Sequence, residues 1–286
     1  QEKGVPIVIK ADGLAAGKGV IIANTNEEAI DAINDMLHGN RFGDAGSRVV
    51  VEEFLRGEEA SFIVMVDGSN ILPMATSQDH KARDNNDKGP NTGGMGAYSP
   101  APIVSPSVFK DAMEKVIKPT VEAMKAEGMP YTGFLYAGLM IDSMGMIKVL
   151  EYNCRFGDPE TQPIMMRLKT NLAKLCISAT QGSLDSVKVE WDERTALGVV
   201  MAAKGYPREY KKGETIKLPE QNSDSKIFHA GTKLDSDNII SNGGRVLCVT
   251  ALGEDIEQAQ KKAYVVVNKV KWSGSYFRTD IGFKGI

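Results

Sequence analysis

The sequence has few of the features that mark membrane, secreted or nucleic-acid-binding proteins. No apolar run approaches the length of a membrane span, and we expect no signal peptide. The lysines and arginines are dispersed and the net charge is −3, which gives no indication of a nucleic-acid partner. The three cysteines are odd in number and lack the spacing of a metal site, so we expect reduced thiols in a cytoplasmic protein: Cys154, Cys176 and Cys248.

The remaining composition is that of a globular protein. Of its 286 residues, 42% are hydrophobic and 25% are charged, and this length suits two domains or one domain with a large appendage. The first residue is Gln1 rather than an initiator Met, so we expect a processed chain or a fragment.

One polar stretch follows directly on a predicted buried strand, at residues 146–150. Residues two apart on a strand share a face, so Glu151 and Asn153 are expected to point together and Tyr152 the other way. A carboxylate beside an amide oxygen suits Mg²⁺ whose other positions are filled by phosphate and water. Taken alone, however, a charged turn after a strand is more often structural.

The next residues add a cation and a predicted helix start. Arg155 can grip a phosphate with its planar guanidinium group. Asp158 and Pro159 have the residue types of an N-cap and a first helical position.

A loop rich in glycine and lysine, residues 10–20, connects two predicted strands, residues 5–9 and 20–23. Its backbone N–H groups and ammonium groups can surround a phosphate. The spacing is not that of a Walker A loop, because Gly13 and Gly17 are one residue too close and Gly19 replaces the Ser or Thr that would bind Mg²⁺. The alternative is a plain hairpin with solvated lysines.

Residues 52–59 place four carboxylates beside another predicted strand. These groups can accept hydrogen bonds from ribose hydroxyls and exocyclic amines. Composition alone favours the alternative, a solvated run of charges.

Residues 78–100 form the longest stretch without hydrophobic periodicity, and such long loops are usually functional or disordered. His80, Lys81 and Arg83 offer hydrogen-bond donors, and Gly93 and Gly94 permit close approach of the backbone to a ligand. A lone histidine is more often structural than catalytic, so His80 is assigned to binding at most.

The other elements are conventional. Thr25 and Glu28 form a predicted capping box for a helix that ends near Gly39. Ser105 and Pro106 open a second helix, which Pro119 kinks or divides. Further predicted strands lie at residues 49–51, 60–66 and 134–142, and further helices at 171–181 and 254–269. After about residue 187, short strands separated by Gly and Pro suggest a β-rich module: residues 195–203, 215–218, 227–232 and 246–252.

Taken together, these segments resemble the ATP-grasp enzymes and, among them, the phosphoribosylamine–glycine ligase (glycinamide ribonucleotide synthetase) family. The resemblance covers nearly the whole chain in the family's order. The matching segments are residues 10–20, 52–59, 78–81, 89–96 and 151–160, followed by 228–232 and 243–247.

The resemblance implies an α+β fold of three parts. These are an N-terminally incomplete ATP-grasp lid at residues 1–57, a catalytic subdomain at 58–187 and a small β-rich C-terminal domain at 188–286. It also implies that the chain begins after the family's N-terminal domain, and that it is a cytoplasmic monomer or weak homodimer.

The implied activity is an ATP-dependent ligation in purine biosynthesis. Glycine's carboxylate would attack the γ-phosphate of ATP to give glycyl phosphate, and the amine of 5-phosphoribosylamine would then displace phosphate. A mobile lid would keep glycyl phosphate from water.

The resemblance also assigns roles to residues. It places Mg²⁺ or Mn²⁺ on Glu151 and Asn153, and it makes Lys10 and Arg155 catalytic. It implies nucleotide binding by Lys10, Gly13, Gly17, Lys18, Gly19, Glu52, Glu53, Phe54, Leu55 and Glu59. It implies binding of glycine, the acyl phosphate or the ribose phosphate by Asp79, His80, Lys81, Asn91, Thr92, Gly93, Gly94, Met95, Arg155 and Asp158.

One departure is that residues 137–140 offer no further metal carboxylate, so a second metal would depend on phosphate and water. Two alternatives remain. One is a different ATP-grasp carboxylate–amine ligase, and the other is a nucleotide-binding module without turnover.

Overall fold

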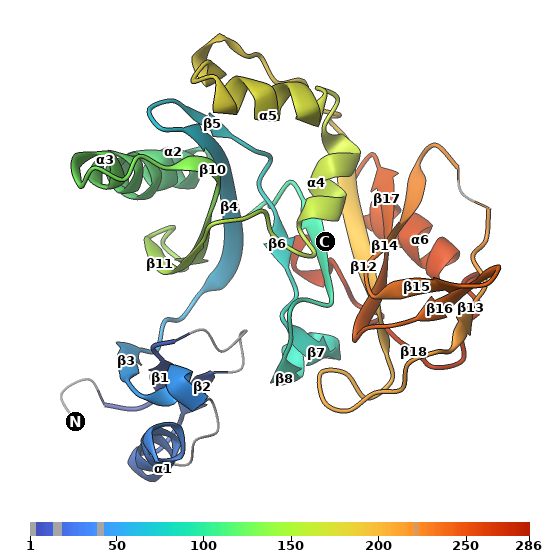
Figure 1. The fold of residues 1–286 in the computed structure, drawn as a ribbon, viewed down its shortest axis with the longest axis horizontal. Coiled ribbons are helices and arrows are strands. Elements are labelled where there is room, and N and C mark those ends of the chain that lie inside the picture. Colours follow the sequence, from blue (N-terminus) through green and yellow to red (C-terminus); the bar gives the residue numbers. More distant parts are fainter. Residues whose placement is uncertain (1–3, 14–18, 39–42, 221) are drawn as a thin grey trace. The chain divides into compact units, whose positions relative to one another are not determined.

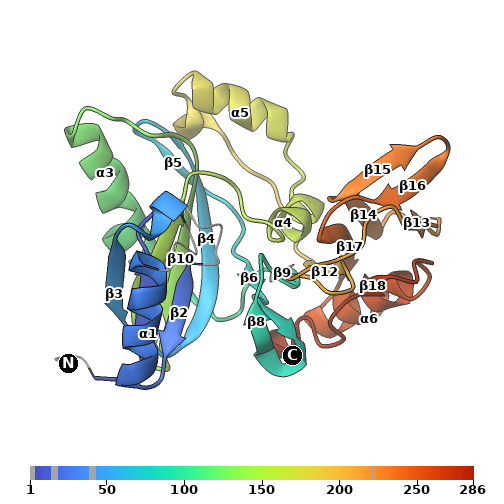
Figure 2. The same ribbon diagram turned by 60° about the horizontal axis from the view of Figure 1, so that its bottom comes forward.

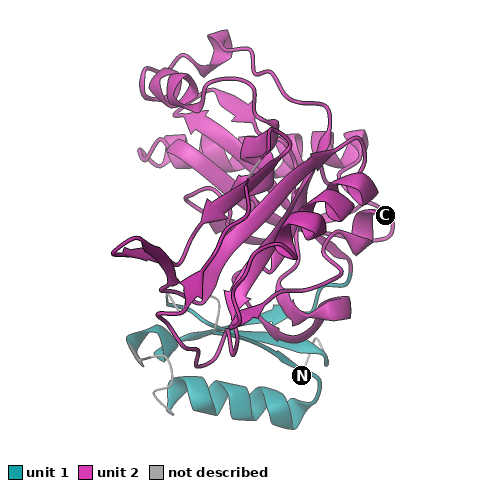
Figure 3. Ribbon diagram, turned by 90° about the vertical axis from the view of Figure 1, so that its right-hand side faces the viewer, with its two compact units in different colours: residues 1–56 teal, residues 57–286 magenta. Residues whose placement is uncertain are grey.

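The computed structural model describes residues 4–13, 19–38, 43–220 and 222–286. The chain forms two compact units, an N-terminal unit of residues 1–56 and a C-terminal unit of residues 57–286 (Figure 3). Within the described residues, no helix is long and apolar enough to cross a membrane.

The N-terminal unit is a three-stranded antiparallel sheet with one helix. Its sheet has the order β2-β1-β3, and a small core of Ile9, Ala32 and Met36 joins the helix to it. Thr25 caps the helix as predicted, since its hydroxyl accepts a 3.1 Å hydrogen bond from the Glu28 N–H. Gly39 lies outside the described residues. The elements are β1 (Ile7–Ala11), β2 (Val20–Ala23), α1 (Asn26–Leu37), a 3₁₀ turn (Gly43–Gly46) and β3 (Val49–Glu53).

The first sheet of the C-terminal unit has the order β11-β10-β4-β5 and is antiparallel throughout. Its strands are β4 (Glu58–Asp67), β5 (Ile71–Pro73), β10 (Thr132–Ile141) and β11 (Ile147–Asn153). One face is covered by a continuous helical segment that carries Val108, Ile117 and Val121 onto the sheet (Figure 1). This segment comprises α2 (Pro106–Asp111), a π-helical stretch (Ala112–Ile117) and α3 (Lys118–Ala126).

The helix start at Ser105 is confirmed, because its hydroxyl accepts a hydrogen bond from the Val108 N–H at 3.3 Å. Pro119 lies in the first turn of α3, immediately after the π-helical stretch, so the helical segment changes type just before this proline but is not divided by it.

The opposite face of the same sheet is apolar only at one end. There Ile63, Met65 and Tyr136 pack against α4 (Thr161–Arg167) and α5 (Leu172–Thr180). The other end of this face carries polar side chains, which are described below.

A second, six-stranded sheet has the order β14-β17-β12-β9-β6, with β18 pairing to β12. Its strands are β6 (Gln78–Asp79), β9 (Gly96–Ser99), β12 (Thr195–Ala203), β14 (Ser225–His229), β17 (Arg245–Gly253) and β18 (Ser275–Tyr276). The helix α6 (Ile256–Val267) packs on β12 and β17. The predicted β-rich module is therefore present, and two of its strands come from residues 78–99.

The expectation of one long loop at residues 78–100 is thus wrong. Met95, Ala97 and Tyr98 are completely buried, but the glycines at 93, 94 and 96 obscure the alternation that marks a strand. The same stretch also contains a small hairpin of β7 (Ala82–Asp84) and β8 (Lys88–Asn91).

A three-stranded sheet of order β13-β16-β15 completes the unit, and Figure 2 shows β15 and β16 side by side as a hairpin. Its strands are β13 (Thr215–Ile216), β15 (Thr232–Asp235) and β16 (Asn238–Ser241).

The predicted helix start at Asp158 and Pro159 is wrong. The helix α4 begins at Thr161, with Glu160 in the N-cap position. The Asp158 side chain is engaged elsewhere, because it pairs with Arg245 from β17 at 2.9 Å. A distant partner therefore outweighs the local capping preference.

Candidate functional site

Three strands of the first sheet bring polar side chains onto one face. Glu151 on β11 lies opposite Gly138 on β10, which in turn lies opposite Ser61 on β4. A Cβ atom at Gly138 would lie only 3.3 Å from the Glu151 Cγ atom, so the glycine leaves room for this carboxylate. Tyr152 points to the other face, where its hydroxyl lies 2.8 Å from the Thr120 hydroxyl.

The expectation that Glu151 and Asn153 point together is confirmed. The Asn153 amide donates a 3.2 Å hydrogen bond to the Glu151 carboxylate. Among the described residues, no three His, Cys, Asp or Glu side chains are grouped so as to hold a metal. A carboxylate and an amide oxygen side by side, and partly open to solvent, fit Mg²⁺ that takes its other ligands from phosphate and water.

Residues 79–81 bring further charges to this face. Lys81 forms an ion pair with Glu59, which stands on β4 two residues before Ser61. Burial by itself lowers the pKa of Lys81, but the charges of Asp79, Glu59 and Glu151 outweigh it and raise this pKa. The ammonium group therefore stays charged and is surrounded by carboxylates.

Asp79 lies in the most acidic part of this group. Burial, and then the nearby charge of Glu160, raise the pKa of Asp79 well above its ordinary value. Glu160 is itself buried, and it accepts a 2.7 Å hydrogen bond from Ser61, whose hydroxyl lies 2.9 Å from that of Tyr136. We call this group the site cluster: Glu59, Asp79, Lys81, Glu151 and Glu160.

His80 points away from the site cluster. Its side chain is completely buried, and its Nε2 accepts a 2.9 Å hydrogen bond from the Gly282 N–H. Burial lowers the pKa of His80, which agrees with a neutral ring in this position. The side chain is thus engaged with the C-terminal segment, and this position favours a structural role over the expected binding role.

A second group of charges surrounds His80. Arg278 is completely buried and donates 2.8 Å hydrogen bonds to the carboxylates of Asp87 and Asp280. Lys284 adds a further ion pair with Asp87 at 2.8 Å. We call this group the anchor cluster: His80, Asp87, Arg278, Asp280 and Lys284.

The glycine-rich segment of residues 91–95 lies beside residues 80 and 81. Thr92 donates from its N–H and its hydroxyl to the Lys81 carbonyl, at 2.7 and 2.9 Å. Gly94 has φ +111°, and a Cβ atom there would lie 2.3 Å from Pro159, so only glycine fits this position. Met95 is completely buried, whereas Asn91 is exposed on β8.

Arg155 and Asp158 follow β11. The Arg155 guanidinium is exposed and donates to the carbonyl of its neighbour Phe156 at 2.8 Å. Asp158 is held by Arg245, a residue from the C-terminal module that sequence analysis did not assign to the site. Arg245 and Arg278 were missed because the partners that link them to the site segments, Asp158 and Asp87, lie 87 and 191 residues away in the chain, where no local pattern reveals them.

The N-terminal unit carries the other predicted nucleotide-binding residues. Lys10 and Glu52 form an ion pair at 2.5 Å, and Glu53 pairs with Ile7 across β1 and β3. Phe54 and Leu55 directly follow β3 and are half-buried.

The glycine-rich loop of this unit is described only at its two ends. The Gly13 N–H donates to Ala45, and the Gly19 carbonyl accepts from Ala11 at 2.8 Å. Gly17 and Lys18 lie outside the described residues.

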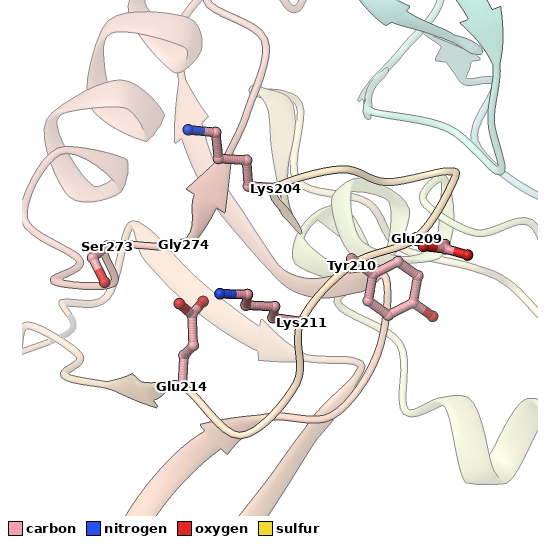
Figure 4. Close-up of a pocket in the computed structure, with 7 residues that line it drawn as sticks. All are labelled: Lys204, Glu209, Tyr210, Lys211, Glu214, Ser273 and Gly274. Atoms are coloured by element: carbon pink, nitrogen blue, oxygen red, sulfur yellow. The ribbon is translucent and has the colours of Figure 1, made fainter.

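An open pocket of about 510 Å³ lies in the C-terminal module, and none of the predicted site residues lines it (Figure 4). Its lining includes Lys204, Lys211 and Glu214. The Glu214 carboxylate already accepts a 2.9 Å hydrogen bond from the Trp272 indole, so it contributes to the local fold.

Comparison with known families agrees with this geometry. Residues 1–161 match the family described as phosphoribosylglycinamide synthetase, ATP-grasp (A) domain, and residues 196–284 match the phosphoribosylglycinamide synthetase C domain. The phosphoribosylamine–glycine ligase of Salmonella typhimurium is 63% identical over 289 residues, which cover 100% of this chain and 67% of that protein.

Solved structures support the same assignment. The crystal structure of the Thermotoga maritima phosphoribosylamine–glycine ligase superposes with a TM-score of 0.90 at 38% identity, covering 98% of this chain and 70% of that one. The fold, though not the function, is shared with a biotin carboxylase domain from Hydrogenobacter thermophilus solved with MgADP, with 17% identity and a TM-score of 0.71 over 96% of this chain and 59% of that one. The predicted α+β ATP-grasp fold is therefore confirmed, and the chain belongs to the phosphoribosylamine–glycine ligase family.

Proposed function

We propose that Glu151 and Asn153 hold Mg²⁺, or Mn²⁺, while this ligase joins glycine to 5-phosphoribosylamine at the expense of ATP. The observation that carries this proposal is the convergence of the two side chains, with 3.2 Å between the Asn153 nitrogen and the Glu151 oxygen. When bound, the metal would neutralise charge on the phosphates of ATP. Lys81 lies close enough to Glu151 for the carboxylate to raise its pKa, so a cation already stands beside the proposed metal ligands.

The chain's own residues then position the nucleotide. Charge spreads over the transferring phosphoryl oxygens, so catalysis depends mainly on positioned cations and hydrogen-bond donors. We assign this role to Lys10 and Arg155, with the glycine-rich loop around Gly13 and Gly19. The backbone of residues 52–55 would face the adenine. Glu59 was expected near the ribose, and it would have to share its carboxylate between that contact and Lys81.

The remaining substrates are assigned to the site cluster and the segments beside it. Asp79 and Lys81, with the segment of residues 91–95 and Asp158, would bind glycine, glycyl phosphate and phosphoribosylamine. Asp79 suits an amine, because the described residues provide its carboxylate with no hydrogen bond, and a bound cation would offset the nearby charge of Glu160. We further propose a cytoplasmic monomer or weak homodimer, divided as expected at residues 1–57, 58–187 and 188–286.

Calorimetric titration of MgADP into the chain tests the metal assignment. We expect Glu151→Gln to weaken binding on the order of a hundredfold in Mg²⁺, since it removes the only charged metal ligand of the pair. Without Mg²⁺, the variant and the unchanged chain should bind ADP alike. Glu114→Gln is the matched control, because Glu114 forms only an exposed ion pair with Lys118. Unchanged MgADP affinity in Glu151→Gln would remove Glu151 from the metal site.

Turnover separates the ligase from a module that only binds nucleotide. We expect phosphate release from ATP to require both glycine and phosphoribosylamine, and Glu151→Gln to lose it. MgADP binding without any release that depends on glycine would instead favour the binding module.

A further inference from the structure

One guanidinium group links two segments that are far apart in the sequence. Arg245, at the start of β17, donates from Nη1 to the carbonyls of Gly93 at 2.7 Å, Gly94 at 3.4 Å and Asp158 at 2.8 Å. Its Nη2 donates to the Asp158 carboxylate at 2.9 Å. The Arg245 side chain is only 21% exposed, whereas the Asp158 side chain is 52% exposed, so the guanidinium is largely covered while its carboxylate partner faces solvent.

The neighbouring groups leave this arrangement little freedom. Gly93 donates its N–H to the Tyr206 hydroxyl at 3.1 Å, so the C-terminal module holds this residue from both its N–H and its carbonyl. A Cβ atom at Gly93 would lie 2.9 Å from the Arg245 guanidinium, so the arginine packs directly on the glycine backbone. At Gly94 a Cβ atom would lie 2.3 Å from Pro159, the residue after Asp158.

The arrangement also explains why an arginine is suited to this position. Its rigid fork presents several N–H donors in one plane, so that it can contact backbone carbonyls and a carboxylate at once. A lysine ammonium is a point charge and cannot span the same set of acceptors. The positive charge also acts on the site cluster, since Arg245 is one of the charges that oppose the rise in the pKa of Asp79.

We propose that Arg245 is a positioning residue for the two substrates other than the nucleotide. Its guanidinium holds the segment of Gly93 and Gly94 against Asp158, in the arrangement that receives glycine and phosphoribosylamine. The inference rests on the proposed function, which assigns both segments to these substrates. It gives the C-terminal module a part in substrate binding.

The test compares Arg245→Met with Arg194→Met. Arg194 is the matched control, because it belongs to the same module but hydrogen-bonds Asp192 and Asp224 instead. In Arg245→Met we expect the KM for glycine or for phosphoribosylamine to rise at least about tenfold, the loss expected for a charge-assisted hydrogen bond. The KM for ATP should stay within about twofold of the control, a split that general loss of structure would not produce. Equal KM values in the two variants would overturn the proposal.

Arg245→Lys separates charge from geometry. We expect Arg245→Lys to retain most of the increase in KM that is expected for Arg245→Met. Normal KM values for both glycine and phosphoribosylamine in Arg245→Lys would overturn the claim that the planar guanidinium is needed for positioning. This variant also serves if Arg245→Met does not fold.

Hydrogen exchange provides a readout that does not need turnover. We expect the amides of residues 92–95 to exchange faster in Arg245→Met than in Arg194→Met, while those of α6 exchange equally in both. Equal exchange at residues 92–95 would overturn the proposal. Different results would contradict the proposed function itself. These are an unchanged chain without glycine-dependent turnover, or a Glu151→Gln variant with unchanged affinity for MgADP.

Discussion

The site cluster and the anchor cluster meet at residues 79–81 but balance their charges differently. In the anchor cluster, the buried Arg278 and the half-buried Lys284 face the carboxylates of Asp87 and Asp280. In the site cluster, the single ammonium group of Lys81 lies near three carboxylates, and a fourth, Glu160, acts on Asp79. Adjacent side chains of one short segment therefore enter opposite electrostatic environments.

We interpret this difference as one between charges that maintain the fold and charges that, under the proposed function, bind a ligand. A balanced, hydrogen-bonded set of buried charges is fully satisfied by the protein itself. An excess of carboxylates is costly without a ligand, and it is favourable where a divalent cation or a substrate amine binds. The comparison predicts that substitutions in the two clusters change stability in opposite directions.

The largest effect is expected for Arg278→Met. Loss of this completely buried side chain removes the main partner of Asp87 and Asp280, whose carboxylates are partly exposed, so we expect a cost of about 1.5–3 kcal/mol, the range for hydrogen bonds to charged groups. Urea denaturation measures this loss of unfolding free energy. Arg194→Met, which removes a partly exposed set of ion pairs, should cost about 1 kcal/mol or less. Similar losses of unfolding free energy in the two variants would show that the anchor cluster contributes no more to stability than the ion pairs of Arg194.

Asp79→Asn should weaken activity without weakening the fold. Removing one of the crowded carboxylates relieves repulsion, so we expect the free energy of unfolding at pH 7 to stay unchanged or to rise by about 1 kcal/mol. The KM for a substrate amine should rise about tenfold through loss of a charged partner. The matched substitution is Asp87→Asn in the anchor cluster, which should destabilise the protein and leave the substrate contacts intact. If Asp79→Asn destabilises as much as Asp87→Asn, the two clusters do not differ in the way described.

The smallest effect concerns acid stability. Burial opposes ionisation of Asp87, but the neighbouring His80, Lys284 and Arg278 side chains outweigh it and hold its pKa well below the ordinary value. A carboxyl with a lowered pKa in the folded state stabilises the protein above the unfolded pKa of about 4, and this contribution is lost as the pH falls. Denaturation between pH 6 and pH 2 should therefore show a shallower loss of stability in Asp87→Asn. Identical slopes in the two proteins would contradict this assignment.

Local patterns predicted the elements that depend on local physics. The two-residue period of strands placed Glu151 and Asn153 together, and the preferences of Thr25 and Ser105 located two helix starts. The same reasoning failed at Asp158, where a contact with Arg245 replaced the expected cap.

The clusters themselves depend on tertiary contacts that no local pattern encodes. Alternation along a strand indicates that His80 points away from Asp79 and Lys81, but it does not say which side holds the ligand. That answer depends on Arg278, whose partner Asp87 lies 191 residues earlier in the chain. The binding role expected for His80 stays a prediction, and the direction of its side chain, toward Gly282, favours a structural role.

The anchor cluster also has a consequence for the order of events during synthesis. His80 accepts its hydrogen bond from a residue 202 positions later, and Asn85 bonds Thr279 across 194 positions. Contacts of such separation form late, because a long loop must close before they contribute any stability. A chain emerging from the ribosome would thus carry residues 79–81 long before their support arrives. Competence to bind the amine would then come in one of the last steps of maturation, when residues 278–284 dock.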